Sequence, residues 1–128
     1  MSDNRKILIV DDEAHILHVV RIKLQKGGFE VVAAMDGREA LELACRLHPL
    51  AIVTDLQMPY LSGLELAVAL ARNPATADIP LLLLTAKGFE LDAQATAGTN
   101  IKFVMTKPFS PRDLLARVNE CVAVAAEV

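Results

Sequence analysis

The chain alternates between short apolar segments and longer segments with the spacing of amphipathic helices. Residues 7–10 are Ile-Leu-Ile-Val and stop at Asp11-Asp12-Glu13. Residues 14–25 then place apolar side chains three or four positions apart, up to Gly27-Gly28. A strand that is apolar at every position is typical of a parallel sheet with helices on both faces. The sequence therefore begins with a strand followed by a helix, the repeating unit of an α/β fold.

The same unit recurs along the chain. We predict five strands, at residues 7–10, 30–34, 51–54, 80–84 and 101–105. Helices are predicted at residues 14–25, from Gly37 to Pro49, after Gly63, and from Pro111 with Ser110 as its cap. Residues 88–98 lack a firm apolar stripe, so a short or mobile helix is expected there.

Five such units predict a doubly wound parallel sheet, for which the common strand order is 2-1-3-4-5. A length of 128 residues is that of one domain, and 53% hydrophobic residues exclude a disordered chain. Aromatic residues make up only 4%, so the core is expected to consist of Val, Ile, Leu and Ala.

Several classes of protein are disfavoured by what the sequence lacks. No apolar run approaches the roughly 20 residues of a membrane helix, and the N-terminal apolar stretch is too short for a signal peptide. We expect a cytoplasmic protein. The 13 basic and 16 acidic residues show no basic cluster, which argues against direct nucleic-acid binding. Cys45 and Cys121 lack metal-ligand spacing and are expected to be buried or partly buried free thiols.

Polar residues follow four of the predicted strands at the end where each strand stops. Asp11 and Asp12, Asp55, Thr85 and Lys107 should therefore share the carboxyl edge of the sheet. Each has an ordinary alternative: a helix cap, a turn hydroxyl or a surface charge. Those alternatives do not explain why all five polar residues should lie at the same edge of the sheet. Three clustered carboxylates repel one another unless a cation is present, and oxygen ligands favour Mg²⁺ or Mn²⁺.

These residues lie in motifs whose order and spacing resemble a known family. The motifs are Ile7–Glu13, Thr54–Pro59 with Gly63, Leu84-Thr85-Ala86 and Lys107-Pro108-Phe109. The chain resembles a response-regulator receiver domain of two-component phosphorelay signalling, from Lys6 to Val124. The resemblance implies a single flavodoxin-like (βα)5 domain over residues 1–128, with a core of about 6–124. Residues 123–128 are too few for an output domain, so we expect either a stand-alone regulator that acts by protein contact or the receiver part of a longer chain.

The resemblance also implies roles for the strand-end residues. Asp55 would accept a phosphoryl group from a sensor histidine kinase or a phosphotransfer protein. Mg²⁺ would be held by Asp12, Asp55 and the backbone carbonyl of Gln57, and by Asp11 through water. Lys107 would pair with Asp55 before the reaction and with a phosphoryl oxygen afterwards. The hydroxyl of Thr85 would move to bond another phosphoryl oxygen and so signal to a downstream protein.

Neighbouring residues would tune the site. Ala86 is small and would leave it open, whereas Gln57 and Lys87 hold positions that set how fast water attacks the acyl phosphate. Val104 stands where receivers often have Tyr or Phe, and Phe103 should point to the opposite face of the strand. We therefore expect coupling to run through Thr85 and residues 87–98, toward a face formed by the fourth helix, fifth strand and fifth helix.

Three further residues are expected to shape the backbone. Pro59 and Gly63 mark a loop after Asp55, and the peptide bond before Pro108 is expected to be cis. Tyr60 in that loop is expected to be exposed, His15 and His18 to lie on a solvated face, and His48 to occupy a turn.

Two other functions stay open beside the phosphoacceptor. A Mg²⁺-dependent phosphohydrolase typically has a second acid two residues after its nucleophilic Asp, where this chain has Gln57. A receiver-like docking module independent of phosphate would not need the complete set of acids, Thr85 and Lys107. We favour the interpretation that the chain is a signalling module rather than an enzyme, and that it catalyses only its own phosphorylation and dephosphorylation.

Overall fold

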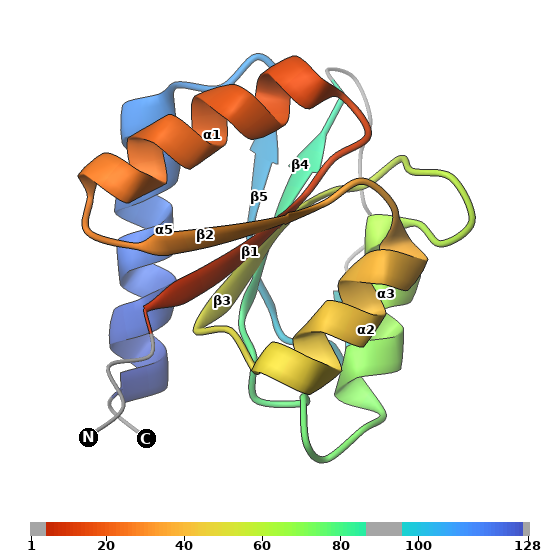
Figure 1. The fold of residues 1–128 in the computed structure, drawn as a ribbon. Coiled ribbons are helices and arrows are strands. Elements are labelled where there is room, and N and C mark those ends of the chain that lie inside the picture. The colour runs from red at the N-terminus through yellow and green to blue at the C-terminus, as the bar shows by residue number, and fades with distance from the viewer. Residues whose placement is uncertain (1–4, 87–95, 127–128) are drawn as a thin grey trace.

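The computed structural model describes residues 5–86 and 96–126, and side chains as far as Ala123. Within these ranges a parallel sheet is flanked by helices (Figure 1). The strands are β1 (Lys6–Val10), β2 (Glu30–Ala34), β3 (Ala51–Asp55), β4 (Leu81–Thr85) and β5 (Ile101–Thr106). The helices are α1 (Ala14–Lys26), α2 (Gly37–Leu47), α3 (Gly63–Ala71) and α5 (Pro111–Ala126). Most of the helix predicted at residues 88–98 falls outside the described ranges.

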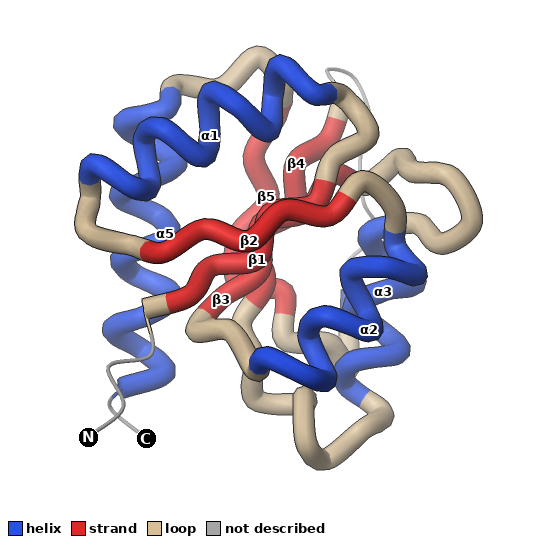
Figure 2. The backbone as a smooth tube through the Cα atoms, in the orientation of Figure 1, coloured by secondary structure: helices blue, strands red, loops and turns tan. Residues whose placement is uncertain are grey.

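The sheet has five strands in the order β2-β1-β3-β4-β5, with every neighbouring pair parallel. This confirms the predicted doubly wound sheet. Helices α1 and α5 cover one face of the sheet, and α2 and α3 cover the other (Figure 2). The chain reverses its winding direction between β1 and β3, where two adjacent carboxyl ends open a space for ligands.

Three strands extend one residue beyond their predicted carboxyl ends. The β3–β4 ladder includes the pair Asp55 and Leu84, and the β4–β5 ladder ends at the pair Thr85 and Thr106. Strand β4 also begins one residue later than predicted, after Pro80, whose ring nitrogen has no hydrogen to donate to a ladder. The polar residues at these ends therefore belong to the sheet and share its rigidity.

The core consists of two apolar layers, one on each face of the sheet. Alternate residues of β1 point to opposite layers: Ile7 and Ile9 pack toward α1 and α5, whereas Leu8 and Val10 pack toward α2 and α3. On the second face, the buried residues of α2 include Ala40 and Ala44, whose small side chains let the helix approach the strands closely. No described helix combines the length and hydropathy required to cross a membrane.

The two cysteines differ in burial, which corrects one expectation. Cys121 is buried in α5, and burial raises the pKa of its thiol to about 11. Cys45 is exposed, contrary to the prediction that it is at least partly buried. It directly follows Ala44, on the buried side of α2, and one residue along a helix turns the side chain by about 100°.

Predictions for the turns and the first helix have mixed outcomes. His48 lies in a turn with φ 48° and Tyr60 is 72% exposed, as expected. Neither Asp11 nor Asp12 caps α1, because the capping position is Glu13, which makes no side-chain capping hydrogen bond. Instead, Asp11 Oδ1 accepts a hydrogen bond from the backbone N–H of Glu13 at 2.9 Å. The ordinary alternative for these two aspartates, a helix cap, is therefore wrong.

Candidate functional site

Three carboxylates meet at the carboxyl edge of the sheet, where β1 and β3 are neighbours. One oxygen each from Asp11, Asp12 and Asp55 lies within 4.8 Å of the others. Asp11 directly follows β1, and Asp55 is the last residue of β3. Asp11 and Asp55 are buried, whereas Asp12 is exposed. The parallel register brings these acids together although Asp12 and Asp55 are 43 positions apart in the sequence, so the cluster is a property of the sheet.

Lys107 reaches this cluster from the end of β5. Its Nζ lies 2.9 Å from Asp11 Oδ2, 3.3 Å from Glu13 Oε1 and 3.5 Å from Asp55 Oδ1. The ammonium donates hydrogen bonds to Asp11 and Glu13. Asp55, which the sequence suggested as its partner, is thus the most distant of the three acids.

Glu13 is a site residue whose place beside Lys107 the sequence did not predict. The available signal was its position as the third acid of Asp11-Asp12-Glu13. At the start of a helix, an acid is equally well explained by the favourable helix dipole. Only the folded chain shows that Glu13 contacts a lysine 94 residues away.

The electrostatics of the cluster act on Asp55 and Lys107. Burial and the negative charge of Asp11 raise the pKa of the Asp55 carboxyl, and the attraction of Lys107 offsets this only in part. For Lys107, burial lowers the pKa, but the hydrogen bond to Asp11 and the surrounding carboxylates outweigh it and raise the pKa overall. Both charges are therefore sensitive to any further charge brought into the site.

Thr85, the last residue of β4, is 1% exposed. Its Oγ1 has no hydrogen-bond partner among the described residues. A buried hydroxyl without a partner is costly, and such groups often serve a ligand. The backbone of the same residue is fixed, because its carbonyl oxygen accepts a hydrogen bond from the N–H of Lys107 at 2.7 Å.

The loop after Asp55 is held close to the sheet. Leu56 donates its backbone N–H to the carbonyl of Leu84 at 2.8 Å, and Gly63 donates to the carbonyl of Leu56 at 2.8 Å. A Cβ at Gly63 would lie 2.4 Å from the backbone oxygen of Asp55, so no larger residue fits there without movement. A capping box between Ser62 and Glu65 then begins α3. Asp55 is thus supported by backbone contacts on both sides.

A cavity of about 340 Å³ opens over these residues, lined by Asp12, Glu13, Asp55, Gln57, Ala86 and Lys107. Gln57 and Ala86 thus line the cavity beside Asp55. Lys87 lies outside the described residues. The peptide bond between Lys107 and Pro108 is cis.

The fifth strand presents its two faces differently. Val104 is 48% exposed, whereas Phe103 is partly buried and packs against the core layer beneath α1 and α5. Alternation along the strand therefore turns the aromatic ring away from the face that Val104 occupies.

The donor set suits a hard divalent cation. Three carboxylates offer only oxygen atoms, and Mg²⁺ is typically held by one or two carboxylates together with water and phosphate oxygens. Acidic groups that repel one another in a partly buried cavity are stabilised by such an ion. Beside them, the ammonium of Lys107 and the hydroxyl of Thr85 supply donors for an anion. The site can therefore hold a cation and an anionic group next to Asp55.

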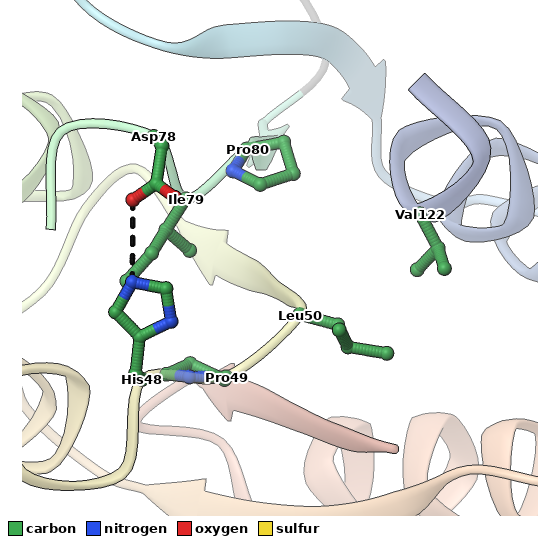
Figure 3. Close-up of a pocket in the computed structure, with 7 residues that line it drawn as sticks. All are labelled: His48, Pro49, Leu50, Asp78, Ile79, Pro80 and Val122. Carbon is green, nitrogen blue, oxygen red and sulfur yellow. Dashed lines mark hydrogen bonds and ion pairs between the residues drawn. The ribbon is translucent and has the colours of Figure 1, made fainter. Parts of the chain in front are cut away.

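A second cavity, of about 220 Å³, lies at the opposite end of the strands (Figure 3). It is bounded by the residues that precede β3 and β4 and by Val122 of α5. On its rim, His48 Nε2 and Asp78 Oδ1 lie 3.2 Å apart. None of the strand-end polar residues line this cavity, so it is separate from the carboxylate site.

Comparisons with known proteins agree with this geometry. The family model of the response regulator receiver domain matches residues 7–119. The chain is 41% identical over 115 residues to the alkaline phosphatase synthesis transcriptional regulatory protein PhoP of Bacillus subtilis, covering 90% of this chain and 47% of PhoP. It is 40% identical over 114 residues to the phosphate regulon transcriptional regulatory protein PhoB of Pseudomonas aeruginosa, covering 89% of this chain and 50% of PhoB. The chain thus spans about half the length of these curated relatives.

A solved structure with a similar backbone is the chemotaxis response regulator CheY4 of Vibrio cholerae. The TM-score is 0.82 at 33% sequence identity, over 91% of this chain and 97% of CheY4. The similarity therefore extends over nearly the whole of both chains.

Proposed function

The chain belongs to the response regulator receiver domain family, and we propose that its Asp55 accepts a phosphoryl group in a two-component phosphorelay. Receiver domains are signalling modules and not enzymes in the usual sense. The proposed donor is a phosphohistidine on a sensor histidine kinase or a phosphotransfer protein. The proposed receiver core is residues 6–124.

One observation carries the proposal. A buried carboxylate, Asp55, lies among two further acids and 3.5 Å from the ammonium of Lys107, beside an open cavity. A carboxylate in this setting can act as a nucleophile toward phosphorus, because the positive charges around it offset the charge of the incoming phosphoryl group.

The proposed reaction transfers the phosphoryl group in one in-line step. An oxygen of Asp55 forms a bond to phosphorus while the bond from phosphorus to the histidine nitrogen breaks, and the electron pair returns to the imidazole ring. The product is an acyl phosphate on Asp55. In it, Lys107 donates to one phosphoryl oxygen and the hydroxyl of Thr85 to another, which supplies a partner that this buried hydroxyl does not find among the residues that the structure describes.

The residues that would hold the metal ion are Asp11, Asp12, Asp55 and the backbone carbonyl of Gln57. Bound there, Mg²⁺ would supply positive charge against the phosphoryl oxygens and the carboxylates, and Mn²⁺ offers similar chemistry. The aspartate side chains also fix the shape of the cavity, because Asp11 is hydrogen-bonded to both Lys107 and the backbone of Glu13.

The proposed signal is a change of surface shape around β5. Movement of Thr85 toward the phosphoryl group would reposition residues 87–98 and change the face that we expect the fourth helix, β5 and α5 to form, with Ala86, Lys87 and Val104 as modulating positions. The target of that face would be a downstream protein. Some relatives are named transcriptional regulators, but we propose that this receiver acts by protein contact and not by touching DNA. Its proposed location is the cytoplasm, where such regulators work.

The test is intact-protein mass spectrometry after incubation with acetyl phosphate and Mg²⁺. Wild type should gain the mass of one phosphoryl group, and Asp55→Asn should gain none. Absence of the adduct on wild type would overturn the proposal and favour a phosphate-independent docking module. Repeated turnover of phosphomonoesters would instead favour the phosphohydrolase.

A further inference from the structure

We propose that Glu13 is a positioning residue that holds the ammonium of Lys107 away from the phosphoryl group on Asp55, and so limits how readily this receiver becomes phosphorylated. The inference rests on the proposed function, because it concerns regulation of the same site. It assigns a role to a residue outside the cluster of three aspartates.

The first argument is the sharing of Lys107. An ammonium has three N–H donors. Two of them are used by Asp11 and Glu13, at 2.9 and 3.3 Å, while Asp55 stands farther away at 3.5 Å. What the two acceptors compete for is the position of the ammonium: Nζ lies nearer to Glu13 than to Asp55, and movement toward a phosphoryl group on Asp55 would weaken its contact with Glu13.

The second argument is that the backbone of Glu13 is held in a position from which its carboxylate can bind the ammonium of Lys107. Its backbone N–H donates to Asp11 Oδ1 at 2.9 Å, and it forms the N-terminal cap position of α1. Its side chain is 49% exposed, lines the cavity and also lies 3.8 Å from His15 Nε2. The backbone of Glu13 is therefore fixed at the rim of the site, whereas the carboxylate of Glu13 can move out into solvent when Lys107 is drawn away.

The consequence is a competition whose outcome can be measured. The acyl phosphate adds a charge of roughly −1.5 to −2 beside Asp55, which attracts Lys107 away from Glu13. Removing Glu13 removes the competing partner. For a partly exposed ion pair, the expected gain is about two- to fivefold in affinity for a phosphoryl mimic.

The experiment measures the affinity for beryllofluoride, a mimic of the phosphoryl group, in saturating Mg²⁺. Tyr60 is the only tyrosine and the chain has no tryptophan, so intrinsic emission reports on the loop after Asp55. Glu13→Gln should bind beryllofluoride about two- to fivefold more tightly and react faster with acetyl phosphate. The matched control is Glu42→Gln, which removes one charge from an exposed position of α2 and should behave like wild type.

A shorter acid separates a positioning role from simple charge repulsion. Glu13→Asp keeps the negative charge but draws the carboxylate back by about 1.5 Å, beyond hydrogen-bond reach of Lys107. If Glu13 acts by holding Lys107, Glu13→Asp should resemble Glu13→Gln. If Glu13 acts only by repelling the mimic, Glu13→Asp should resemble wild type, and the inference is wrong.

A double-mutant cycle provides the second check. In a Lys107→Met background, Glu13→Gln should no longer change the affinity for beryllofluoride. An unchanged effect in that background would contradict the inference. If wild type binds beryllofluoride and Glu13→Gln binds it with the same affinity, only this inference is overturned. Should wild type bind none, the proposed function and the inference both fail.

Discussion

The negative charge of Asp55 is unfavourable in the folded chain. Burial comes first and repulsion from Asp11 second in raising its pKa, and Lys107 offsets them only in part. The folded state therefore binds a proton at Asp55 more readily than the unfolded state does. Stability falls as pH rises from the ordinary value of 3.8 through the raised pKa, and at neutral pH the ionised Asp55 weakens the fold. The site keeps a carboxylate that stability alone would not favour.

This leads to a prediction for Asp55→Asn in buffer without divalent cations. The variant should melt roughly 3–5 °C higher than wild type at pH 7, the shift that about 1 kcal/mol gives in a domain of this size. The gain should shrink as pH falls toward 3.8, because protonated Asp55 no longer carries the charge. Circular dichroism melts across pH test this. An exposed acid of α5, Asp113→Asn, is the control and should show no gain; an unchanged or lower melting temperature for Asp55→Asn would contradict the prediction.

At the scale of elements, the loop from Asp55 to α3 shows how closely the backbone is packed around the site. Gly63 has no room for a side chain, since a Cβ would lie 2.4 Å from the carbonyl oxygen of Asp55 and 3.0 Å from Leu83. The loop also contacts α2, because the guanidinium of Arg38 lies 3.9 Å from the ring centre of Tyr60. The loop is thus fixed at both its sheet end and its outer end.

We predict that Gly63→Ala destabilises the fold by about 1–3 kcal/mol, because backbone atoms must move to admit the methyl group. The loop that carries Gln57 should shift with it, so affinity for Mg²⁺ should fall as well. Urea unfolding and a Mg²⁺ titration measure the two effects. In the control, Gly27→Ala, the new methyl group meets the end of the flexible Leu115 side chain and should cost less. Equal losses for the two variants would refute the backbone explanation.

At the scale of the whole molecule, the site holds much of the net charge. The chain carries −3 at neutral pH, and the four acids Asp11, Asp12, Glu13 and Asp55 with Lys107 give the site a formal charge of −3. The opposite end of the strands carries a different feature, the cavity beside His48 and Asp78. The site thus holds a net negative charge at the carboxyl edge of the sheet, which a divalent cation would offset.

Binding of Mg²⁺ should accordingly stabilise the whole fold. At tenfold excess over its dissociation constant, a ligand that binds only the folded state adds about 1.4 kcal/mol. Wild type should therefore melt a few degrees higher in Mg²⁺ than in NaCl of the same ionic strength. Asp12→Asn, which removes one exposed ligand, should lose most of this response. If both proteins respond equally, Asp12 is not a ligand.

Much of this architecture could be predicted from the sequence. Apolar runs and helical spacing predicted all five strands, because a buried parallel strand must be apolar on both faces. The strand order 2-1-3-4-5 was expected only as the common order of such sheets, and the structure confirms it. Parallel strands also align their carboxyl ends, so Asp11, Asp55, Thr85 and Lys107 could be assigned to one edge before any distance was known. Both predictions depend on the spacing of apolar residues and on the order of strands and helices along the chain, which can be read from short stretches of sequence.

Only the tertiary structure decided which of those side chains contact one another. It brought Lys107 closest to Asp11, added Glu13 as a further partner and exposed Cys45. It also buried the hydroxyl of Thr85 without a hydrogen-bond partner within residues 5–86 and 96–126. Sequence patterns fix which edge or face a residue occupies. Distances of a few ångströms depend on how whole elements pack, and burial depends on what covers a residue from distant parts of the chain.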